Sequence, residues 1–249
     1  MLSATALDGL PEVTPGDDLG GLIGAALAQA GLRNGDVLVI AHKVVSKAEG
    51  RIRRLSDVRP SARARELAGH VGKDARHVQI VLDECREVLR ADHGVLICVT
   101  RHGYVCANAG VDASNVPGDD TVVLLPEDPD GSARALRKRI EALTGTAPGV
   151  VITDSFGRAW RNGQCDVTIG CAGIAPLDDW RGRRDATGRK LKATWIAVAD
   201  ELAAAADLAR RKDGGQPVIR VRGAARHVTA DDGPGARALV RPEAEDLFR

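Results

Sequence analysis

Short apolar runs that end at turn or charged residues constrain the fold of this chain most strongly. Asp36–Ala41 (DVLVIA) is typical of a buried strand, because it is short, rich in β-branched residues and bounded by polar segments. The same reasoning predicts strands at Val78–Leu82, Val95–Val99, Tyr104–Ala107, Thr121–Leu125, Val150–Thr153, Val167–Cys171 and Pro217–Val221. Aromatic residues make up only 2% of the chain, so these strands must pack through Ala, Val, Leu and Ile.

Helical periodicity marks several segments between these runs. Leu19–Ala30 has apolar residues at helical spacing, and Gly31 is placed to end the helix. Further helices are expected at Ser61–His70, Glu84–Arg90, Asp130–Thr144 and Trp195–Lys212. Tyr104–Ala107 is expected to pair with Val95–Val99 as a hairpin. This mixture of hairpins and helix crossovers predicts an α+β fold, with a mixed β-sheet and flanking helices.

The charge balance and the cysteines narrow the function. The 35 basic and 34 acidic residues give a formal net charge of +1, which argues against a general nucleic-acid surface. The five cysteines form no C-x-x-C pair, so reduced and mostly buried thiols are expected. The sequence shows neither a signal-peptide pattern nor an apolar run long enough for a membrane span. We therefore expect a soluble, cytoplasmic protein with no membrane partner.

Ile152–Gly170 (ITDSFGRAWRNGQCDVTIG) holds the densest set of candidate chemical groups. Asp154 and Ser155 come at the point where the apolar run Val150–Ile152 stops. They are followed within a dozen residues by Arg158, Arg161, Asn162, Gln164 and Asp166. Acidic oxygens beside fixed cations suit a site for phosphate and a divalent metal. A polar connection between two strands is the alternative interpretation.

Neither of the two common glycine-rich phosphate-binding motifs is present, so any nucleotide site must be of a non-P-loop type. The nearest substitute is His42–Gly50 (HKVVSKAEG), which is expected to be extended from Lys43 to Lys47. Alternation would place Lys43 and Lys47 on one face and Ser46 on the other. Two lysines and a hydroxyl could hold a triphosphate there. An edge strand protected by lysine is the alternative.

Two more segments offer polar groups. Ala107–Asn115 (ANAGVDASN) carries Asp112 and Asn115 among small residues that would let the backbone approach a ligand, although a plain turn has the same composition. Trp180–Thr194 holds six arginine and lysine side chains in a nearly neutral protein. Such a local excess suits an anionic substrate, and a solvated basic loop is the alternative.

The Ala-rich helix carries one further candidate. Glu201 aligns with Ala197 and Ala205 at helical spacing, so we expect it to face the packed side of the helix. A carboxylate in that position would need a metal or a cationic partner.

Taken together, these segments resemble one family, the coenzyme F420-0:L-glutamate ligases, which are GTP-dependent γ-glutamyl ligases of deazaflavin biosynthesis. The resemblance rests on six motifs in order. They are GLPEV at Gly9–Val13, HKVVSKAEG at His42–Gly50, ANAGVDASN at Ala107–Asn115, TDSFGRAWRNGQ at Thr153–Gln164, RDATGRKLKAT at Arg184–Thr194 and ADELAAAA at Ala199–Ala206. Some members carry a C-terminal flavin-reductase-like domain, whereas this 249-residue chain is expected to be the stand-alone form with a single ligase domain over residues 1–249.

The resemblance implies GTP and L-glutamate as co-substrates, F420-0 as the acceptor, a divalent metal (Mn²⁺ or Mg²⁺) and a homodimer; K⁺ is a further candidate ion. Asp112, Asp154 and Ser155 are implied to be the metal ligands and catalytic residues. The implied GTP site contains Leu10, Pro11, Glu12, Val13, Ser46, Lys47 and Asn115, with Lys43 and Glu201 as additional members. Gln164, Arg158 and Arg161 are added on chemical grounds alone.

The implied chemistry is consistent with these groups. A free carboxylate does not react with an amine, because oxide is a very poor leaving group. Transfer of the GTP γ-phosphate to the carboxylate gives an acyl phosphate, which the glutamate α-amine attacks to form an amide. Further γ-linked glutamates could be added in the same way. The alternatives are a ligase of the same fold that uses another amino acid or acceptor, and a non-catalytic GTP-binding module.

Overall fold

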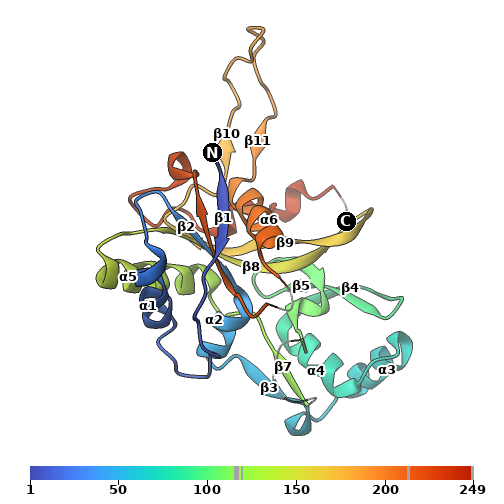
Figure 1. The fold of residues 1–249 in the computed structure, drawn as a ribbon. Helices are drawn as coiled ribbons and strands as arrows, with labels where there is room; N and C mark the ends of the chain where they lie inside the picture. Colours follow the sequence, from blue (N-terminus) through green and yellow to red (C-terminus); the bar gives the residue numbers. More distant parts are fainter. Residues whose placement is uncertain (115–117, 119, 212–213, 248–249) are drawn as a thin grey trace.

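The computed structural model describes residues 1–114, 118, 120–211 and 214–247, and within them a five-stranded mixed sheet organises the chain (Figure 1). Its spatial order is β1 (Ser3–Ala6), β12 (Val218–Arg222), β2 (Val37–Ala41), β8 (Gly149–Arg158) and β9 (Arg161–Ala172). The central pair, β2 and β8, is parallel, and the other neighbouring pairs are antiparallel. The predicted α+β class with a mixed sheet is therefore confirmed.

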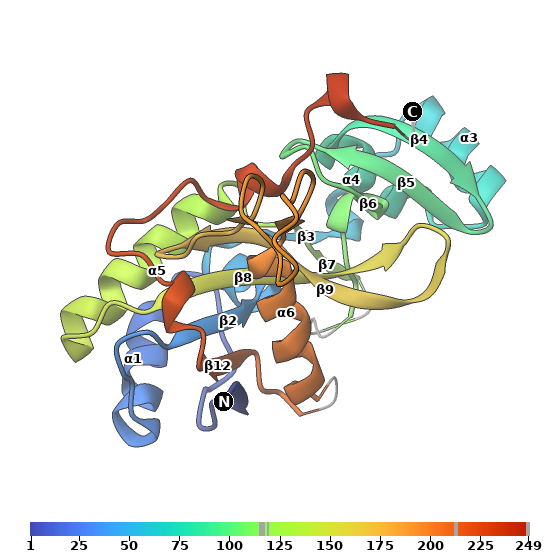
Figure 2. The same cartoon turned by 90° about the horizontal axis from the view of Figure 1, so that it is seen from above.

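Helices cover both faces of this sheet (Figure 2). Helices α1 (Leu19–Ala30) and α5 (Pro129–Thr144) pack on the face that carries Ile40 and Ile152. Helix α6 (Val198–Ala209) packs on the opposite face, which carries Val39 and Val151. Successive strand residues alternate between the faces, so runs that are apolar at every position are buried on both sides. This accounts for the predicted strands at the centre of the sheet.

A second lobe has a core of its own. The three-stranded sheet of β4 (Cys85–Asp92), β5 (Val95–Thr100) and β6 (Val105–Ala107) packs with α3 (Ala62–Val71) and α4 (Ala75–Glu84). The pair β3 (Ile52–Arg54) and β7 (Thr121–Val123) joins this lobe to the main sheet (Figure 1). The predicted hairpin between Val95–Val99 and Tyr104–Ala107 is confirmed by the pairing of β5 with β6.

Two predictions in the second lobe are wrong in secondary structure. Val78–Leu82 belongs to helix α4, because Asp74 caps that helix and Val78 and Val81 share its buried face. Glu84–Arg90 was expected to be helical, yet Cys85–Asp92 forms β4 by pairing with β5. A short apolar run fits either periodicity, and tertiary pairing decides between them.

The segment Lys43–Lys47 was expected to be extended, and the structure corrects this. Helix α2 (His42–Ala48) begins directly after β2. In a helix, residues four apart lie on the same face, so Lys43 still aligns with Lys47, and His42 aligns with Ser46.

The polar stretch within Ile152–Gly170 is a hairpin instead of a loop. Strand β8 continues to Arg158, and β9 begins at Arg161 and pairs with it. Trp160 at the tip has a left-handed backbone with φ 59° and is 82% exposed.

The helix expected at Trp195–Lys212 is shorter at both ends, since α6 runs from Val198 to Ala209. At its start, Trp195–Ile196 forms β11 and pairs with β10 (Asp178–Asp179) at the base of a long exposed arm (Figure 1).

The remaining elements are 3₁₀ turns, η1 (Leu55–Asp57), η2 (Asn108–Gly110), η3 (Ala225–His227), η4 (Ala236–Leu239) and η5 (Glu243–Glu245). All five cysteines are free thiols, and burial raises the pKa of Cys98, Cys106 and Cys171 to about 12, which keeps them protonated and unreactive. The expectation of reduced, mostly buried thiols is thus confirmed. Across the described residues, no helix combines the length and apolar character needed to cross a membrane.

An ion pair between a buried aspartate and a partly exposed arginine fixes the start of β2. Arg222 on β12 donates from Nε and Nη2 to Asp36 at 2.8 and 2.7 Å, and the Arg33 amide donates at 2.9 Å. Asp36 is only 1% exposed. Burial alone would raise the pKa of Asp36, but the hydrogen bonds from Arg222 and Arg33 outweigh it and hold the pKa below its ordinary value.

We predict that Asp36→Asn lowers the free energy of unfolding by about 2 kcal/mol near neutral pH, because charge-assisted bonds to a buried group are lost. The native carboxylate has a lowered pKa, so its contribution is present above about pH 4 and disappears as the pH falls further. Urea unfolding measured near neutral pH and in acid tests this. Asp179, which forms an exposed ion pair with Arg181, provides the control. Asp179→Asn should leave the midpoint of unfolding almost unchanged. A wild-type advantage that persists undiminished in acid would contradict the assignment.

Candidate functional site

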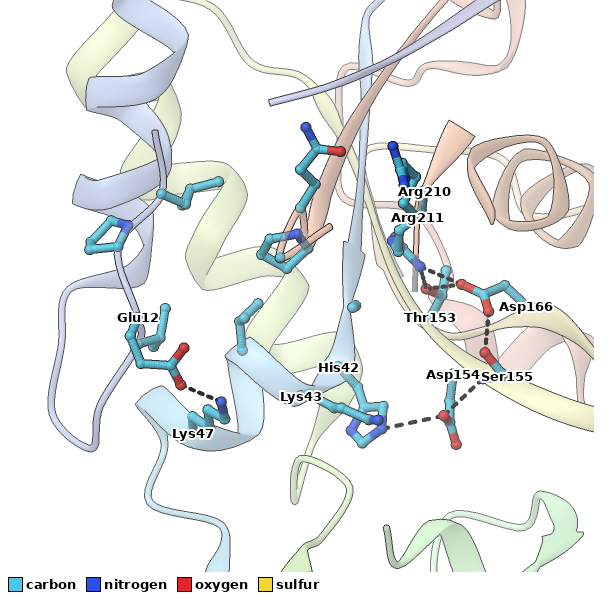
Figure 3. A pocket seen from close by; sticks show the side chains of 18 residues that line it. Glu12, His42, Lys43, Lys47, Thr153, Asp154, Ser155, Asp166, Arg210 and Arg211 are labelled. Atoms are coloured by element: carbon cyan, nitrogen blue, oxygen red, sulfur yellow. Dashed lines mark hydrogen bonds and ion pairs between the residues drawn. The ribbon is translucent and has the colours of Figure 1, made fainter. Parts of the chain in front are cut away.

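A cavity of about 440 Å³ lies at the carboxyl end of β2, beside the middle of its parallel neighbour β8 (Figure 3). The region beyond the carboxyl end of a parallel strand is a preferred place for ligand sites. The cavity is within the size range of small-molecule sites. It is lined by Leu10, Pro11, Glu12, Val13, Ala41, His42, Lys43, Val44, Lys47, Thr153, Asp154, Ser155, Asp166, Arg210, Arg211, Gly215, Gln216 and Pro217.

Asp154 and His42 face each other across this edge (Figure 3). His42 Nε2 lies 3.3 Å from Asp154 Oδ1, and the same carboxylate oxygen accepts a hydrogen bond from the Ser155 amide at 2.8 Å. His42 is nearly fully buried, and its Nδ1 lies 3.3 Å from Ser46 Oγ. The second oxygen of Asp154 has no partner among the described residues. It is therefore available to a ligand in the cavity.

Asp166 forms the centre of a buried polar network on the adjacent wall (Figure 3). Ser155 Oγ donates to Asp166 Oδ1 at 2.6 Å, and Thr153 Oγ1 donates to Oδ2 at 2.9 Å. Arg210, at the end of α6, donates from Nη1 to Oδ2 at 2.5 Å. Asp166 is 1% exposed and the Arg210 side chain 8% exposed. The attraction between the two charges and the hydrogen bonds from the two hydroxyl groups offset the removal of the carboxylate from water.

The opposite wall joins the N-terminal segment to α2. Lys47 Nζ donates to Glu12 Oε1 at 2.5 Å, with the lysine nearly buried and the carboxylate 68% exposed. Leu10, Pro11 and Val13 add apolar surface beside this pair. The cavity thus offers both charged and apolar walls, as sites for amphipathic ligands do.

Lys43 connects the cavity to the second lobe. Its ammonium lies 2.6 Å from Asp112 Oδ2 and donates to Ser114 Oγ at 2.5 Å. Asp112 also accepts from the Ser114 amide at 2.7 Å. Burial alone would raise the pKa of Asp112, but the hydrogen bonds from Lys43 and Ser114 outweigh it and lower the pKa. Asp112 does not itself line the cavity. Its carboxylate is paired with the Lys43 ammonium, which lies where a metal cation could otherwise bind.

The structure brings together most of the residues that the sequence singled out. Leu10, Pro11, Glu12, Val13, Lys43, Lys47, Asp154 and Ser155 all line the cavity. Ser46 lies beneath it and contacts His42. Asn115 lies outside the described residues. Arg158, Arg161 and Gln164 are exposed along the β8–β9 hairpin and do not line the cavity.

Glu201 was expected to face the packed side of its helix, and this is wrong. It is exposed on the first turn of α6 and does not line the cavity. Its neighbour Asp200 turns inward instead, accepting the Thr168 amide at 2.9 Å, and burial raises the pKa of Asp200. The buried face of α6 runs through Ala199, Leu202 and Ala206, one position away from the alignment assumed.

Three cavity residues were not assigned a role from sequence. His42 lies within a quoted motif, and Asp166 lies within the polar stretch, but the roles of both depend on strand pairing. Asp166 reaches Ser155 only because the two are register partners on β8 and β9. Arg210 ends an Ala-rich helix whose orientation the sequence does not give, so no local signal could have identified it.

The donor set is compatible with a hard divalent cation. Among the described residues there is no cluster of three His, Cys, Asp or Glu side chains that could hold a metal alone. Asp154 and Ser155 nevertheless present oxygen atoms at the cavity wall, and oxygen is the preferred ligand of Mg²⁺ and similar ions. Mg²⁺ is usually held by one or two carboxylates together with substrate phosphates and water, not by an all-protein cage.

A second cavity, of about 710 Å³, lies between the second lobe and the C-terminal segment. Arginines and acidic residues line it together, among them Arg86, Arg101, Asp128, Asp130 and Arg237. None of the predicted catalytic, metal or GTP residues lies there. Size alone therefore does not identify the site, and the convergence of predicted residues favours the smaller cavity.

Comparison with known proteins identifies the family of the chain. Residues 9–223 match the family model described as F420-0:Gamma-glutamyl ligase. The chain is 43% identical to the coenzyme F420:L-glutamate ligase of Methanothermobacter thermautotrophicus, over 100% of this chain and 99% of that relative. It is 47% identical to that of Methanopyrus kandleri, over 96% and 94%, and 46% identical to that of Archaeoglobus fulgidus, over 98% and 94%. The chain therefore belongs to the F420-0:gamma-glutamyl ligase family.

Proposed function

We propose that this protein is a GTP-dependent ligase that joins L-glutamate to F420-0 in coenzyme F420 biosynthesis. The observation that supports this most is one cavity that combines Asp154 and Ser155 with Lys43, Lys47 and Arg210. Ligation driven by a nucleoside triphosphate needs oxygen ligands for a cation and fixed positive charge for the phosphates. The chain has these groups together around the end of β2, and its relatives bear the name of the proposed activity.

In this proposal the apolar surface of Leu10, Pro11 and Val13 accommodates the guanine base. Lys43 and Lys47, on one face of α2, would supply positive charge to the phosphates. A divalent metal, when bound by Asp154 and Ser155, would neutralise charge on the transferring phosphoryl group. Asp112 would join these ligands once Lys43 turns from it to the phosphate.

The reaction then proceeds in two displacements. A carboxylate oxygen of the acceptor attacks the γ-phosphorus of GTP, the bond to the β-phosphate oxygen breaks, and GDP leaves. The deprotonated α-amine of glutamate next attacks the acyl carbon, the amide bond forms, and inorganic phosphate leaves. The residues of the cavity orient the groups and stabilise charge, and none of them needs to become covalently attached.

Removing the charge of Asp154 tests its role. Asp154→Asn keeps the size of the side chain but weakens a cation site, so we expect ligation to fall by more than about 100-fold. The melting temperature should stay close to that of the wild type. Glu66→Gln makes the same chemical change on an exposed face of α3 and should retain activity. Near-normal turnover in Asp154→Asn would refute the assignment.

The contact between Lys43 and Asp112 generates a second prediction. The ammonium competes with a metal for the same carboxylate, so Lys43→Met should strengthen Mn²⁺ binding to the nucleotide-free protein by about tenfold. Asp112→Asn should weaken it by a similar factor. Titration calorimetry in the absence of GTP measures both. Unchanged affinity in both variants would show that Asp112 is not a metal ligand.

The dependence of GDP release on the other substrates distinguishes the proposed ligase from a non-catalytic GTP-binding module and from a ligase for another amino acid. We expect GDP release to require both the deazaflavin acceptor and L-glutamate, with product masses that increase by whole glutamyl units. A competition with mixed amino acids tests the choice of glutamate. GTP binding without turnover would favour a non-catalytic module, and incorporation of another amino acid would favour a different ligase.

A further inference from the structure

A buried histidine lies against the carboxylate of Asp154 at the cavity wall. Ala41 and Thr153 are register partners in the parallel pair of β2 with β8. The next residues of the two strands are His42 and Asp154, and their side chains meet where β2 ends (Figure 3). His42 is only 1% exposed, so its polar atoms depend on protein groups for their hydrogen bonds.

The two ring nitrogens of His42 face different groups. Nδ1 lies 3.3 Å from Ser46 Oγ, one turn further along α2, and Nε2 lies 3.3 Å from Asp154 Oδ1. In the neutral ring, a lone pair on Nε2 would face the negative charge of the carboxylate. The hydrogen therefore lies on Nε2, and the Ser46 hydroxyl donates to Nδ1. His42 thus turns an N–H toward Asp154.

This N–H is in contact with Asp154 without being satisfied by it. Nε2 completes no hydrogen bond with any of the described residues. A buried N–H without an acceptor costs free energy, so a turn of the Asp154 carboxylate that brings Oδ1 into line with Nε2 is favoured. Hydrogen bonds at functional sites are often long in the ligand-free protein and shorten when the ligand binds.

The two oxygens of Asp154 are not equivalent. Oδ1 accepts from the Ser155 amide at 2.8 Å and faces His42, whereas Oδ2 has no partner among the described residues. A cation that binds through Oδ2 alone therefore meets one oxygen of this carboxylate. Mg²⁺ and Mn²⁺ take octahedral oxygen sites, whereas Ca²⁺ accepts up to about eight oxygen atoms and often binds both oxygens of one carboxylate. One-oxygen binding therefore favours the smaller cations.

We propose that His42 is a positioning residue whose N–H holds Oδ1 of Asp154, so that a divalent cation in the cavity binds through Oδ2 alone and Mn²⁺ or Mg²⁺ is preferred to Ca²⁺. The proposal rests on the proposed function, because it assigns a role to His42 in the metal site described there. Groups that hold metal ligands in place through hydrogen bonds commonly contribute about 10- to 100-fold to metal affinity.

The test uses Mn²⁺ binding to the full chain in the presence of GDP, followed by the loss of the free-ion electron paramagnetic resonance signal, with Ca²⁺ titrated as a competitor. His42→Leu removes the N–H, so we expect Mn²⁺ affinity to fall by roughly tenfold. The ratio of Ca²⁺ affinity to Mn²⁺ affinity should rise severalfold, because Oδ1 becomes accessible to the cation.

Two further variants serve as matched controls. His42→Gln places an amide N–H near the position of Nε2, so it should keep both the Mn²⁺ affinity and the cation ratio close to those of the wild type. His70→Leu makes the same chemical change as His42→Leu at an exposed position of α3 and should alter neither value. A loss in His42→Gln as large as in His42→Leu would contradict the role of the N–H.

A double-mutant cycle shows whether His42 acts through Asp154. In an Asp154→Asn background, His42→Leu should cause little further loss of Mn²⁺ affinity. Additive losses, unchanged affinity in His42→Leu, or equal losses for Mn²⁺ and Ca²⁺ would overturn the inference, while weaker binding in Asp154→Asn would leave the metal site intact. Failure of the wild-type protein to bind Mn²⁺ at all would instead overturn the proposed metal site together with this inference.

His42 is buried, so the folding of each variant must be controlled by thermal unfolding. If His42→Leu is not native, His42→Asn replaces it in the same measurements. The shorter amide takes the place of Nδ1 beside Ser46 and is too short to reach Asp154. The expected result is again weaker Mn²⁺ binding with a higher ratio of Ca²⁺ to Mn²⁺ affinity, and wild-type values in His42→Asn would contradict the inference.

Discussion

The parallel pairing of β2 with β8 is the interaction on which the rest of the site depends. Its register places Ile40 beside Ile152 and Ala41 beside Thr153, so β2 ends directly before Asp154, while β8 continues beyond it in its pairing with β9. Helix α2 therefore begins beside Asp154, and His42 reaches it. The apolar residues of the two strands are fully buried on both faces, which holds this edge in place.

Around that edge, three ion pairs join parts of the chain that are distant in sequence. Glu12 pairs with Lys47, Asp112 with Lys43, and Asp166 with Arg210. These pairs connect the N-terminal segment, the second lobe and the end of α6 to the same cavity. Buried or half-buried pairs of this kind contribute less to stability than to fixing geometry, because desolvation offsets their attraction. These ion pairs thus hold the charged side chains of the site in place without a ligand.

Much of the fold could be predicted from sequence. This holds where the hydrophobic periodicity of a segment and the residues that begin and end it indicate the same element. Leu19–Ala30 has the predicted bounds, with Gly31 at its end, and the central strands lie where apolar runs indicated. Val78–Leu82 and Glu84–Arg90 exchanged their expected states, because five to seven residues fit either period and the pairing with β5 decided the outcome.

The site residues likewise divide into those that local sequence could identify and those that it could not. Motifs identified Asp154, Ser155 and Lys47, because the functional groups of these residue types are recognisable from sequence. Asp166 and Arg210 could not be assigned, because their roles arise from cross-strand register and helix orientation, which are tertiary properties. The predicted buried face of the Ala-rich helix was wrong by one position. Asp200 therefore faces inward, and Glu201 is exposed.

Anomalous diffraction from a crystal grown with GDP and Mn²⁺ would locate the metal and the nucleotide directly. We expect a manganese peak within coordination distance of Asp154 and Ser155 and next to the terminal phosphate, with Lys47 beside the phosphates. A manganese peak and a diphosphate in the larger cavity near Arg86 and Arg237, with the edge of β2 and β8 empty, would contradict this expectation.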